Sequence, residues 1–593
     1  MVEADRSIFR LLGDFVPHVS PRRRKQFVLL ILLMLLGAGA ELVTIGAVVP
    51  FISIMADPEA AFRFPLLQET FTALGWQKPE AIVAPMTGLF LLIVALATVT
   101  RLLLLWASNR YVFALGYDVG VALYKRTLNQ PYSFHIARNT SEIIAAVNKV
   151  QAVLGGAVKP VLEGVIALVL SIAIISTLAY IQLGATSIAT TTFVLAYLVF
   201  GGLSRLRIKT NGKHIAEAQT DRVRCVQEGL GAIRDVILDN SQHQITQTFA
   251  KVDQRLRRAQ ASNAFLGQVP RYLIEAVGVF LIIGLAWFLA AKEGGLMGAL
   301  PVLGALALGA QRLLPLLQRL YNAWAKMTGN QQMFADVLEL LELPVPPRGR
   351  NRAPPLPFER EIRLDGVGFR YARGHEQVLK EIDLTIEKGS RIGIIGPTGS
   401  GKSTLVDIIM GLLEPTEGRL LIDGATIDAS NREAWQQRIS HVPQHIFLAD
   451  ATIAENIAIG VPSSGIDMSR VRNAARCACI AEFIEANPKA YKAPVGERGI
   501  QLSGGQRQRL GIARALYREA DVLVFDEASS ALDTETETAV MKAINALDSS
   551  LTLILIAHRI HTLRDCSKVV TLETGQVKPE DQRVSVKSPQ AQV

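Results

Sequence analysis

The fold of the C-terminal half is decided by one glycine-rich stretch, Gly396-Pro397-Thr398-Gly399-Ser400-Gly401-Lys402-Ser403-Thr404. It follows an apolar run at 391–395, typical of a buried strand, and precedes a helical pattern at 405–412. This strand, loop and helix order is that of a P-loop, whose backbone N–H groups surround phosphate oxygens at a helix N-terminus. The stretch therefore predicts a nucleotide site in which Lys402 contacts the β- and γ-phosphates and Ser403 contacts Mg²⁺.

A second apolar run, at 522–525, ends in two adjacent carboxylates, Asp526 and Glu527. With a P-loop upstream, Asp526 is predicted to hold Mg²⁺, directly or through water. Glu527 is predicted to polarise the attacking water as a general base. We therefore expect ATP and Mg²⁺ as cofactors and ATP hydrolysis as the reaction.

Between these motifs lies Leu502-Ser503-Gly504-Gly505-Gln506, which resembles the signature motif of ABC transporters. Further marks of that family match at single positions: Tyr371 resembles the aromatic that stacks on adenine, Gln444 the Q-loop glutamine, Asp533 the end of the D-loop, and His558 the switch histidine. The resemblance implies that Gln444 and His558 join Glu527 in catalysis. It also implies that Gln444 joins Ser403 and Asp526 at the metal.

The resemblance also implies a dimer, in which two ATP molecules are buried between the P-loop of one copy and Ser503 and Gly504 of the other. This chain carries one such domain and should therefore work in pairs. A homodimer is favoured because neither Glu527 nor His558 is replaced. A heterodimer stays open.

The N-terminal half predicts a membrane domain. Half of the chain's residues are hydrophobic and only 19% are charged, which is low for a soluble protein. A membrane helix needs about 20 apolar residues, and six segments approach this length: 27–55, 86–106, 161–181, 186–203, 272–291 and 296–317. Polar intervals with helical spacing separate some of them, with turns expected near 129–144 and 226–241.

The basic residues indicate the orientation of this domain. Arg22, Arg23, Arg24 and Lys25 directly precede the first apolar segment, as expected for a cytoplasmic flank. We therefore expect a multi-pass protein of the inner membrane with its N-terminus and its ATPase in the cytosol. The net charge of +9 is explained by such flanks, and no nucleic-acid partner is expected, because the basic residues form no dense patch interleaved with aromatics.

The domain boundaries follow from composition. A transmembrane domain at 1–340 precedes a linker at 341–360 that is rich in proline and arginine. An α/β ATPase domain follows at 361–578, and its alternating strands and helices predict a mostly parallel sheet. The remainder, 579–593, is a polar tail. The fold class is thus a six-helix membrane domain of the ABC exporter type fused to a P-loop ATPase.

Charged residues within or beside membrane spans are candidates for substrate binding, because they are costly in lipid. Four arginines qualify: Arg101, Arg271, Arg312 and Arg319. Guanidinium groups bind phosphate or pyrophosphate with two hydrogen bonds, which favours an anionic headgroup. For Arg271 and Arg319, the alternative is that they mark the membrane boundary.

These features resemble PglK-type lipid-linked oligosaccharide flippases, notably Val269-Pro270-Arg271 before the fifth segment and the stretch 312–319. The resemblance implies a polyprenyl-pyrophosphate oligosaccharide moved to the outer leaflet. Alternatives are another lipid of the lipid A precursor type, a drug or a peptide. A more distant alternative is a gated channel or a regulator, which substrate-stimulated hydrolysis with net transport would exclude.

Overall fold

The computed structural model describes residues 8–56, 82–181, 183–290, 295–345, 354–371, 376–527, 534–545, 550–556, 563 and 566–578. The chain forms two compact units, which are described separately below. One comprises Met1–Gln130 and Arg138–Val345, and the other comprises Pro131–Ala137 and Pro346–Val593. The polar tail lies outside the described residues, and the finer domain boundaries stay predictions.

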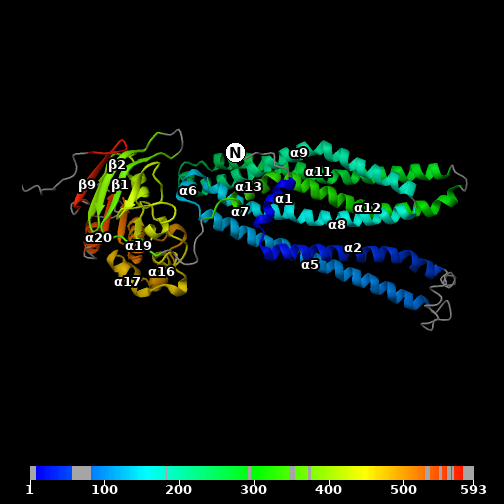
Figure 1. Cartoon of the computed structure of the whole chain (residues 1–593), viewed down its shortest axis with the longest axis horizontal. Helices are drawn as coiled ribbons and strands as arrows, with labels where there is room; N and C mark the ends of the chain where they lie inside the picture. Colours follow the sequence, from blue (N-terminus) through cyan, green and yellow to red (C-terminus); the bar gives the residue numbers. More distant parts are fainter. Residues whose placement is uncertain are drawn as a thin grey trace, which may run out of the picture. The chain divides into compact units, whose positions relative to one another are not determined.

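The first unit is built from helices, and six long ones carry the six predicted apolar segments (Figure 1). They are α2 (Pro21–Ala56), α5 (Val83–Leu128), α8 (Lys159–Ile181), α9 (Leu183–Gly231), α11 (Gln242–Ala290) and α12 (Gly295–Gly329). Within the described residues, four helical stretches are long and apolar enough to cross a membrane: Pro21–Thr44, Val83–Leu128, Thr140–Ser176 and Thr186–Gly231.

Shorter helices complete this unit, namely α1 (Ile8–Phe15), η1 (Val16–His18), α7 (Thr140–Val153), the π-helical turn η3 (Leu154–Val158), α10 (Ile233–Leu238) and α13 (Gln331–Leu341). As the polar intervals predicted, the long helices continue past their apolar parts. α9 has 49 residues, which is about 70 Å of helix. The predicted turn at 226–241 contains α10. That at 129–144 contains α6 (Tyr132–Ala137), which groups with the second unit.

The long helices pack in pairs, with α9 along α11, α8 along α12 and α2 along α5 (Figure 1). α12 is central, because it contributes to three of the buried clusters in the described structure. Its Leu313 and Leu317 pack with Phe193 of α9 and Ile274 of α11. Its Leu316 packs with residues of α2 and α8. Large side chains on α5, such as Leu102 and Trp106, stay exposed, as expected for a lipid-facing surface.

A proline lies inside α11 and leaves one helical carbonyl without its usual donor. Pro270 has no N–H, so the carbonyl oxygen of Leu266 loses its helical partner. The hydroxyl of Tyr321 on α12 donates to this oxygen at 3.1 Å, and the Gln318 amide donates to the next carbonyl, that of Gly267, at 3.1 Å. α12 therefore supplies the hydrogen bond that the proline removes from α11.

This contact predicts a measurable loss of stability. Tyr321 is only 5% exposed, and in Tyr321→Phe the part-buried Leu266 carbonyl loses that donor, at a cost of about 1–3 kcal/mol. We expect a lower unfolding temperature in detergent. Tyr272→Phe removes the hydroxyl of a tyrosine that is 65% exposed on α11 and should leave the unfolding temperature unchanged. Equal effects of the two substitutions would argue against this role of Tyr321.

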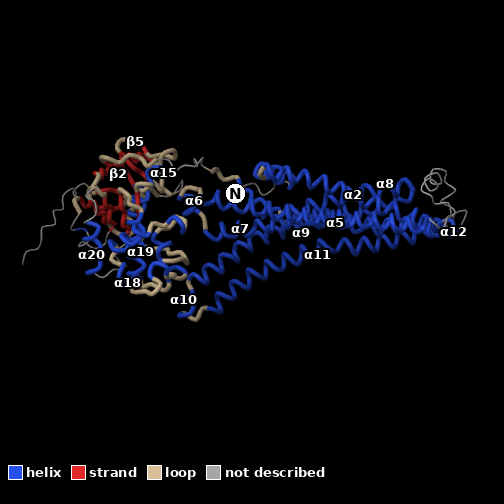
Figure 2. Tube along the Cα trace, turned by 90° about the horizontal axis from the view of Figure 1, so that it is seen from below, coloured by secondary structure: helices blue, strands red, loops and turns tan. Residues whose placement is uncertain are grey.

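The second unit holds the strands (Figure 2). One sheet is antiparallel, in the order β2 (Leu379–Glu387), β1 (Glu361–Phe369), β4 (Glu417–Ile422) and β5 (Ala425–Thr426). The other has the order β10 (Gln576–Val577), β9 (Lys568–Glu573), β3 (Arg391–Ile395), β8 (Thr552–Ile556), β7 (Val522–Asp526) and β6 (Ile439–Val442). Its strands are parallel except β10, which confirms the predicted, mostly parallel sheet.

The helices and helical turns of this unit are α6, α14 (Lys402–Ile409), α15 (Arg432–Gln436), α16 (Ile453–Ile457), η4 (Ser463–Gly465), α17 (Met468–Cys477), α18 (Ala481–Glu485), η5 (Ala490–Lys492), η6 (Glu497–Gly499), α19 (Gly504–Tyr517) and α20 (Thr534–Asn545). Two buried cores support them. One joins both sheets to α14 around the fully buried Trp435. The other packs α16, α17, α18 and α19 against β7 and β8.

Candidate nucleotide site and membrane arginines

The sheet topology brings three of the predicted motifs to one edge. The P-loop follows β3, the carboxylates Asp526 and Glu527 end or follow β7, and Gln444 comes two residues after β6. β8 lies between β3 and β7 and runs parallel to both. Ligands bind at the carboxyl ends of strands in parallel α/β sheets, so this edge is the candidate nucleotide site.

The P-loop backbone requires its glycines. Gly401 has φ +100°, and a Cβ there would lie 2.8 Å from the Leu379 side chain. A Cβ at Gly396 would lie 2.2 Å from the carbonyl oxygen of Leu572. The Ser400 hydroxyl is buried and, within the described structure, has no hydrogen-bond partner. A tight loop with an available hydroxyl before a helix N-terminus fits the phosphates of ATP.

Lys402, only 7% exposed, occupies the centre of this loop. Its ammonium group donates to the carbonyl oxygens of Gly396 at 2.8 Å and Pro397 at 3.0 Å. Burial raises the pKa of Asp526, as does the charge of Glu527, while Lys402 lowers it. The positive charge of Lys402 is therefore held by the loop's own carbonyls and acts on the carboxylate of Asp526.

A third carboxylate, that of Asp407 on α14, lies near enough to Asp526 to feel its charge. No sequence motif predicted this, because the two residues are far apart in the sequence. Burial, followed by the charge of Asp526, raises the pKa of Asp407 to about 6. Asp407 thus adds negative charge near Asp526, but within the described residues no three His, Cys, Asp or Glu side chains form a group that could hold a metal ion.

Gln444 and Glu527 contact each other directly. The Gln444 amide donates to a Glu527 carboxylate oxygen at 2.7 Å. Glu527 has φ +49°, a backbone conformation that is uncommon for a residue with a side chain. Left-handed backbone at a catalytic position is typical of functional sites, and the contact links the predicted general base to the predicted Q-loop residue.

Tyr371 lies beside the P-loop. Its hydroxyl shares a hydrogen bond with the Thr404 hydroxyl at 2.9 Å, and its ring stands edge-on to Phe369 at 5.0 Å between centroids. The ring remains half exposed, so a face is accessible to a base. Burial raises the pKa of Tyr132 on α6, as do the charges of Asp407 and Tyr371.

The signature motif begins α19. Ser503 is the N-cap, its hydroxyl accepts from the Gln506 N–H at 3.2 Å, and the Gln506 side chain accepts from the Ser503 N–H at 2.8 Å. This capping box leaves Ser503 and Gly504 exposed. That Ser503 and Gly504 contact ATP bound by the P-loop of a second copy remains a prediction. Asp533 and His558 lie outside the described residues, so their roles also stay predictions.

Two of the four candidate substrate arginines have carboxylate partners in the structure. Arg101 on α5 forms an ion pair with Glu41 on α2, and Arg271 pairs with Glu275 one turn later on α11 at 2.9 Å. Arg312 lies on α12, with its side chain outside the described residues. Arg319, on the same helix, is exposed. Arg101 and Arg271 are exposed as well, so among these three Arg319 differs in that no ion pair with a carboxylate is found for it within the described part.

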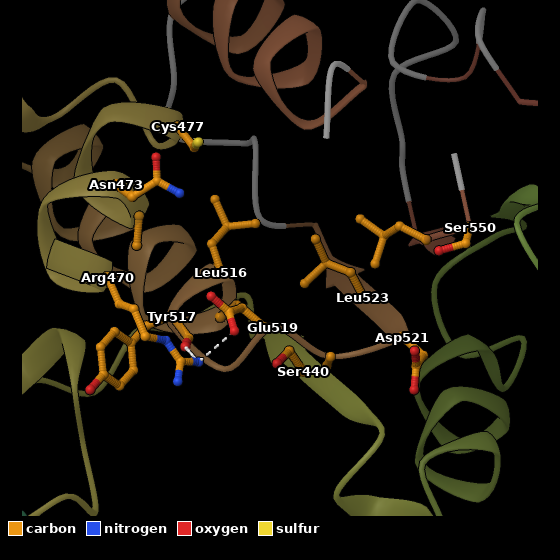
Figure 3. Close-up of a pocket in the computed structure, with 14 residues that line it drawn as sticks. Ser440, Arg470, Asn473, Cys477, Leu516, Tyr517, Glu519, Asp521, Leu523 and Ser550 are labelled. Atoms are coloured by element: carbon orange, nitrogen blue, oxygen red, sulfur yellow. Dashed lines mark hydrogen bonds and ion pairs between the residues drawn. The ribbon is translucent and has the colours of Figure 1, made fainter. Parts of the chain in front are cut away.

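A separate cavity of about 300 Å³ lies among α17, the end of α19 and the starts of β6 and β7 (Figure 3). Arg470 reaches its wall and pairs with Glu519 at 3.1 Å. Arg470 also lies over the Tyr517 ring at 5.0 Å. None of the predicted nucleotide-site residues lines this cavity, which is therefore distinct from the candidate nucleotide site.

The raised pKa of Asp407 predicts a pH-dependent stability. Folding raises this pKa above the ordinary 3.8, so the carboxyl's contribution to stability is full below about pH 4 and is lost as the pH rises through about 6. We expect Asp407→Asn to raise the unfolding temperature relative to wild type more at about pH 8 than at about pH 5, without nucleotide. Asp450→Asn, which removes an exposed carboxylate, controls for net charge. An identical gain at both pH values would contradict the prediction.

Comparison with known proteins agrees with the motifs. The family model described as ABC transporter matches residues 379–530, and the model described as ABC transporter transmembrane region matches residues 27–292. An ATP-dependent lipid A-core flippase of Cupriavidus pinatubonensis is 31% identical over 85% of this chain and 84% of its own length. A protein of the same name from Chromohalobacter salexigens is 34% identical over 63% of this chain and 64% of its own length.

A solved structure is similar to this chain over both its membrane region and its ATPase. The structure of a bacterial Atm1-family ABC exporter with ATP bound matches with a TM-score of 0.75 and 25% identity, over 93% of this chain and 94% of that one. Both the helical membrane region and the ATPase are therefore shared. The chain belongs to the ABC transporter family, as an exporter-type half-transporter that joins a multi-pass membrane region to an ATP-binding ATPase.

Proposed function

We propose that this protein is a flippase that uses ATP hydrolysis to move a phosphorylated glycolipid from the inner to the outer leaflet of the cytoplasmic membrane. It acts as a homodimer, with the N-terminus and the ATPase in the cytosol. The observation that carries the proposal is the combination of a well-formed ATPase site with exposed arginines on the membrane helices, at Arg101, Arg271 and Arg319. Arginine binds phosphoryl groups with paired hydrogen bonds.

In the ATPase, the Ser403 hydroxyl, the Asp526 carboxylate and the Gln444 amide oxygen would hold Mg²⁺, which would supply positive charge beside the phosphates of the substrate ATP. Water attacks the terminal phosphoryl group of that ATP. Lys402 binds these phosphates, and Tyr371 offers its ring face to the adenine. Glu527 accepts a proton from the attacking water, and Gln444, 2.7 Å away, orients that carboxylate.

Two substrate classes are supported by different observations. The stretch around Pro270 and Arg271, together with the Arg312–Arg319 segment, favours a polyprenyl-pyrophosphate oligosaccharide. The printed names of the relatives favour a glycolipid of the lipid A-core type. Both present phosphoryl groups beside sugars, so arginine recognition applies to either.

Substrate-stimulated ATP hydrolysis in nanodiscs tests the proposal. A polyprenyl-pyrophosphate oligosaccharide and a lipid A-type glycolipid are compared with a neutral amphipathic drug. At least one glycolipid should stimulate hydrolysis, and Arg319→Ala should weaken that stimulation while leaving basal hydrolysis unchanged. Arg257→Ala, on the polar part of α11, is the control. Stimulation by the drug alone, or equal losses in both variants, would contradict headgroup recognition.

A further inference from the structure

A basic cleft between α9 and α11 is not used by the proposed transport or hydrolysis. It is a hollow of about 360 Å³ that we call the stalk cleft. It is lined by Asn211, His214, Lys251, Gln254, Arg255 and Arg258, together with Ala259. The basic residues of α11, at spacings of four and three, share one helical face and extend over about 10 Å.

The charge of this cleft is poorly compensated by the protein. Arg255 meets the Asp221 carboxylate at 3.4 Å, but Asp221 also pairs with Arg224 at 2.9 Å. In the part of the chain that the structure describes, no ion pair is recorded for Lys251 or Arg258. Cations held on one face of a helix repel each other, so an anion that bridges them would relieve this repulsion.

The cleft is supported by ordered packing. Leu256 and Ala259 on α11 are buried, whereas the four polar cleft residues of this helix are exposed. At one end, the Asn211 side chain donates to the Ser262 hydroxyl and to the Asn263 side-chain oxygen, both at 2.9 Å. These bonds hold α9 and α11 in register. The donors of the cleft are therefore presented from two helices that are joined to each other.

The donor chemistry selects a phosphoryl ligand. Two guanidinium groups, one ammonium group, an imidazole and the Gln254 amide offer many N–H donors, and the charged ones form the stronger hydrogen bonds. A ligand with several negatively charged oxygens uses them best, and a pyrophosphate or an organic polyphosphate has this character. A monocarboxylate would leave most of the donors unused.

The position along the helices favours a water-soluble ligand. His214 lies beyond the apolar segment that ends near Leu203, and Arg258 lies before the one that begins near Tyr272, which places the cleft roughly 15–20 Å past the apolar parts. The headgroup layer extends only about 5–8 Å past the hydrocarbon core on each side. The phosphate of a membrane lipid would therefore stop short of the cleft.

We infer that the stalk cleft is a binding site for a soluble polyphosphate anion, separate from the P-loop and from the membrane arginines. The anion bridges α9 and α11 and stabilises the polar part of both helices. The inference does not depend on the substrate that is flipped.

Calorimetric titration of the full-length protein with inorganic pyrophosphate in nanodiscs tests this site, with saturating ADP to occupy the P-loop. Lys251→Gln and Arg258→Gln should each weaken binding about tenfold, the usual effect of losing a charged hydrogen bond. Arg257→Gln is the matched control, because this neighbouring arginine pairs with Asp253 at 3.4 Å and does not line the cleft. It should change the affinity less than about twofold, the scatter expected for an exposed ion pair.

Three results would overturn the inference: no pyrophosphate binding by the wild type, unchanged affinity in both cleft variants, or an equal loss in Arg257→Gln. A second titration, in nanodiscs that contain a polyprenyl pyrophosphate, distinguishes the source of the anion. An unchanged affinity for inorganic pyrophosphate supports a soluble ligand. A lower affinity, caused by competition from the polyprenyl pyrophosphate, would overturn the assignment to a soluble ligand. Failure to flip any lipid would leave these titrations unaffected, so the two proposals fail separately.

Discussion

Glu527→Gln will retain ATP binding but lose nearly all ATP turnover. Glutamine keeps the size of the side chain and can still meet Gln444, which lies 2.7 Å from the carboxylate, but it cannot accept a proton from water. Loss of a general base lowers rates by about 10²–10⁴-fold. The measurement is steady-state phosphate release at saturating ATP, with nucleotide affinity measured separately by a fluorescent analogue.

The control for Glu527→Gln is Glu519→Gln in the same unit. Glu519 pairs with Arg470 and has an exposed side chain, so its neutralisation should leave turnover within about twofold of wild type, as for other exposed ion pairs. Near-normal turnover in Glu527→Gln would show that another group acts as the base. Loss of ATP binding in that variant would show instead that Glu527 supports the site structurally.

Lys402→Ala will lose ATP affinity, whereas Glu527→Gln keeps ATP affinity and loses turnover. The ammonium group is held at 2.8 Å from the Gly396 carbonyl, where it can contact two phosphates. Each hydrogen bond to a charged group contributes about 1.5–3 kcal/mol, so two such bonds correspond to a loss of affinity of at least about 100-fold. Equilibrium binding of labelled ATP measures it.

Because Lys402 also bonds the loop's own carbonyls, its removal could loosen the loop. The unfolding temperature of Lys402→Ala therefore has to be compared with that of Lys380→Ala, which truncates an exposed lysine on β2. Weak binding with a preserved unfolding temperature supports a direct phosphate contact. ATP affinity within about threefold of wild type, a change of less than 1 kcal/mol, would contradict that contact.

The elements that sequence reasoning predicted are those whose signals are local. An apolar strand before Gly396 and a helix after Thr404 are contiguous, so the P-loop and its surroundings follow from a few neighbouring residues. The six membrane segments follow from hydropathy alone, because a helix must satisfy its own backbone in lipid. The parallel sheet follows from the alternation of strands and helices.

The features that the sequence did not indicate all depend on contacts between distant residues. The ion pair of Arg101 with Glu41 joins two helices, and no local pattern says that the two charges meet. The position of Asp407 beside Asp526 requires the fold of the whole sheet. The same holds for the donation of Tyr321 to the carbonyl that Pro270 leaves free.

The most direct test of the central claim is flipping in proteoliposomes that contain only this protein. A short-chain polyprenyl-pyrophosphate oligosaccharide and a lipid A-type glycolipid are each placed in the leaflet that faces the ATPase, and their appearance on the other side is followed after ATP is added. The account predicts ATP-dependent flipping of at least one of them, which stops with Glu527→Gln. Vesicles with intact ATP hydrolysis that flip neither glycolipid would contradict it.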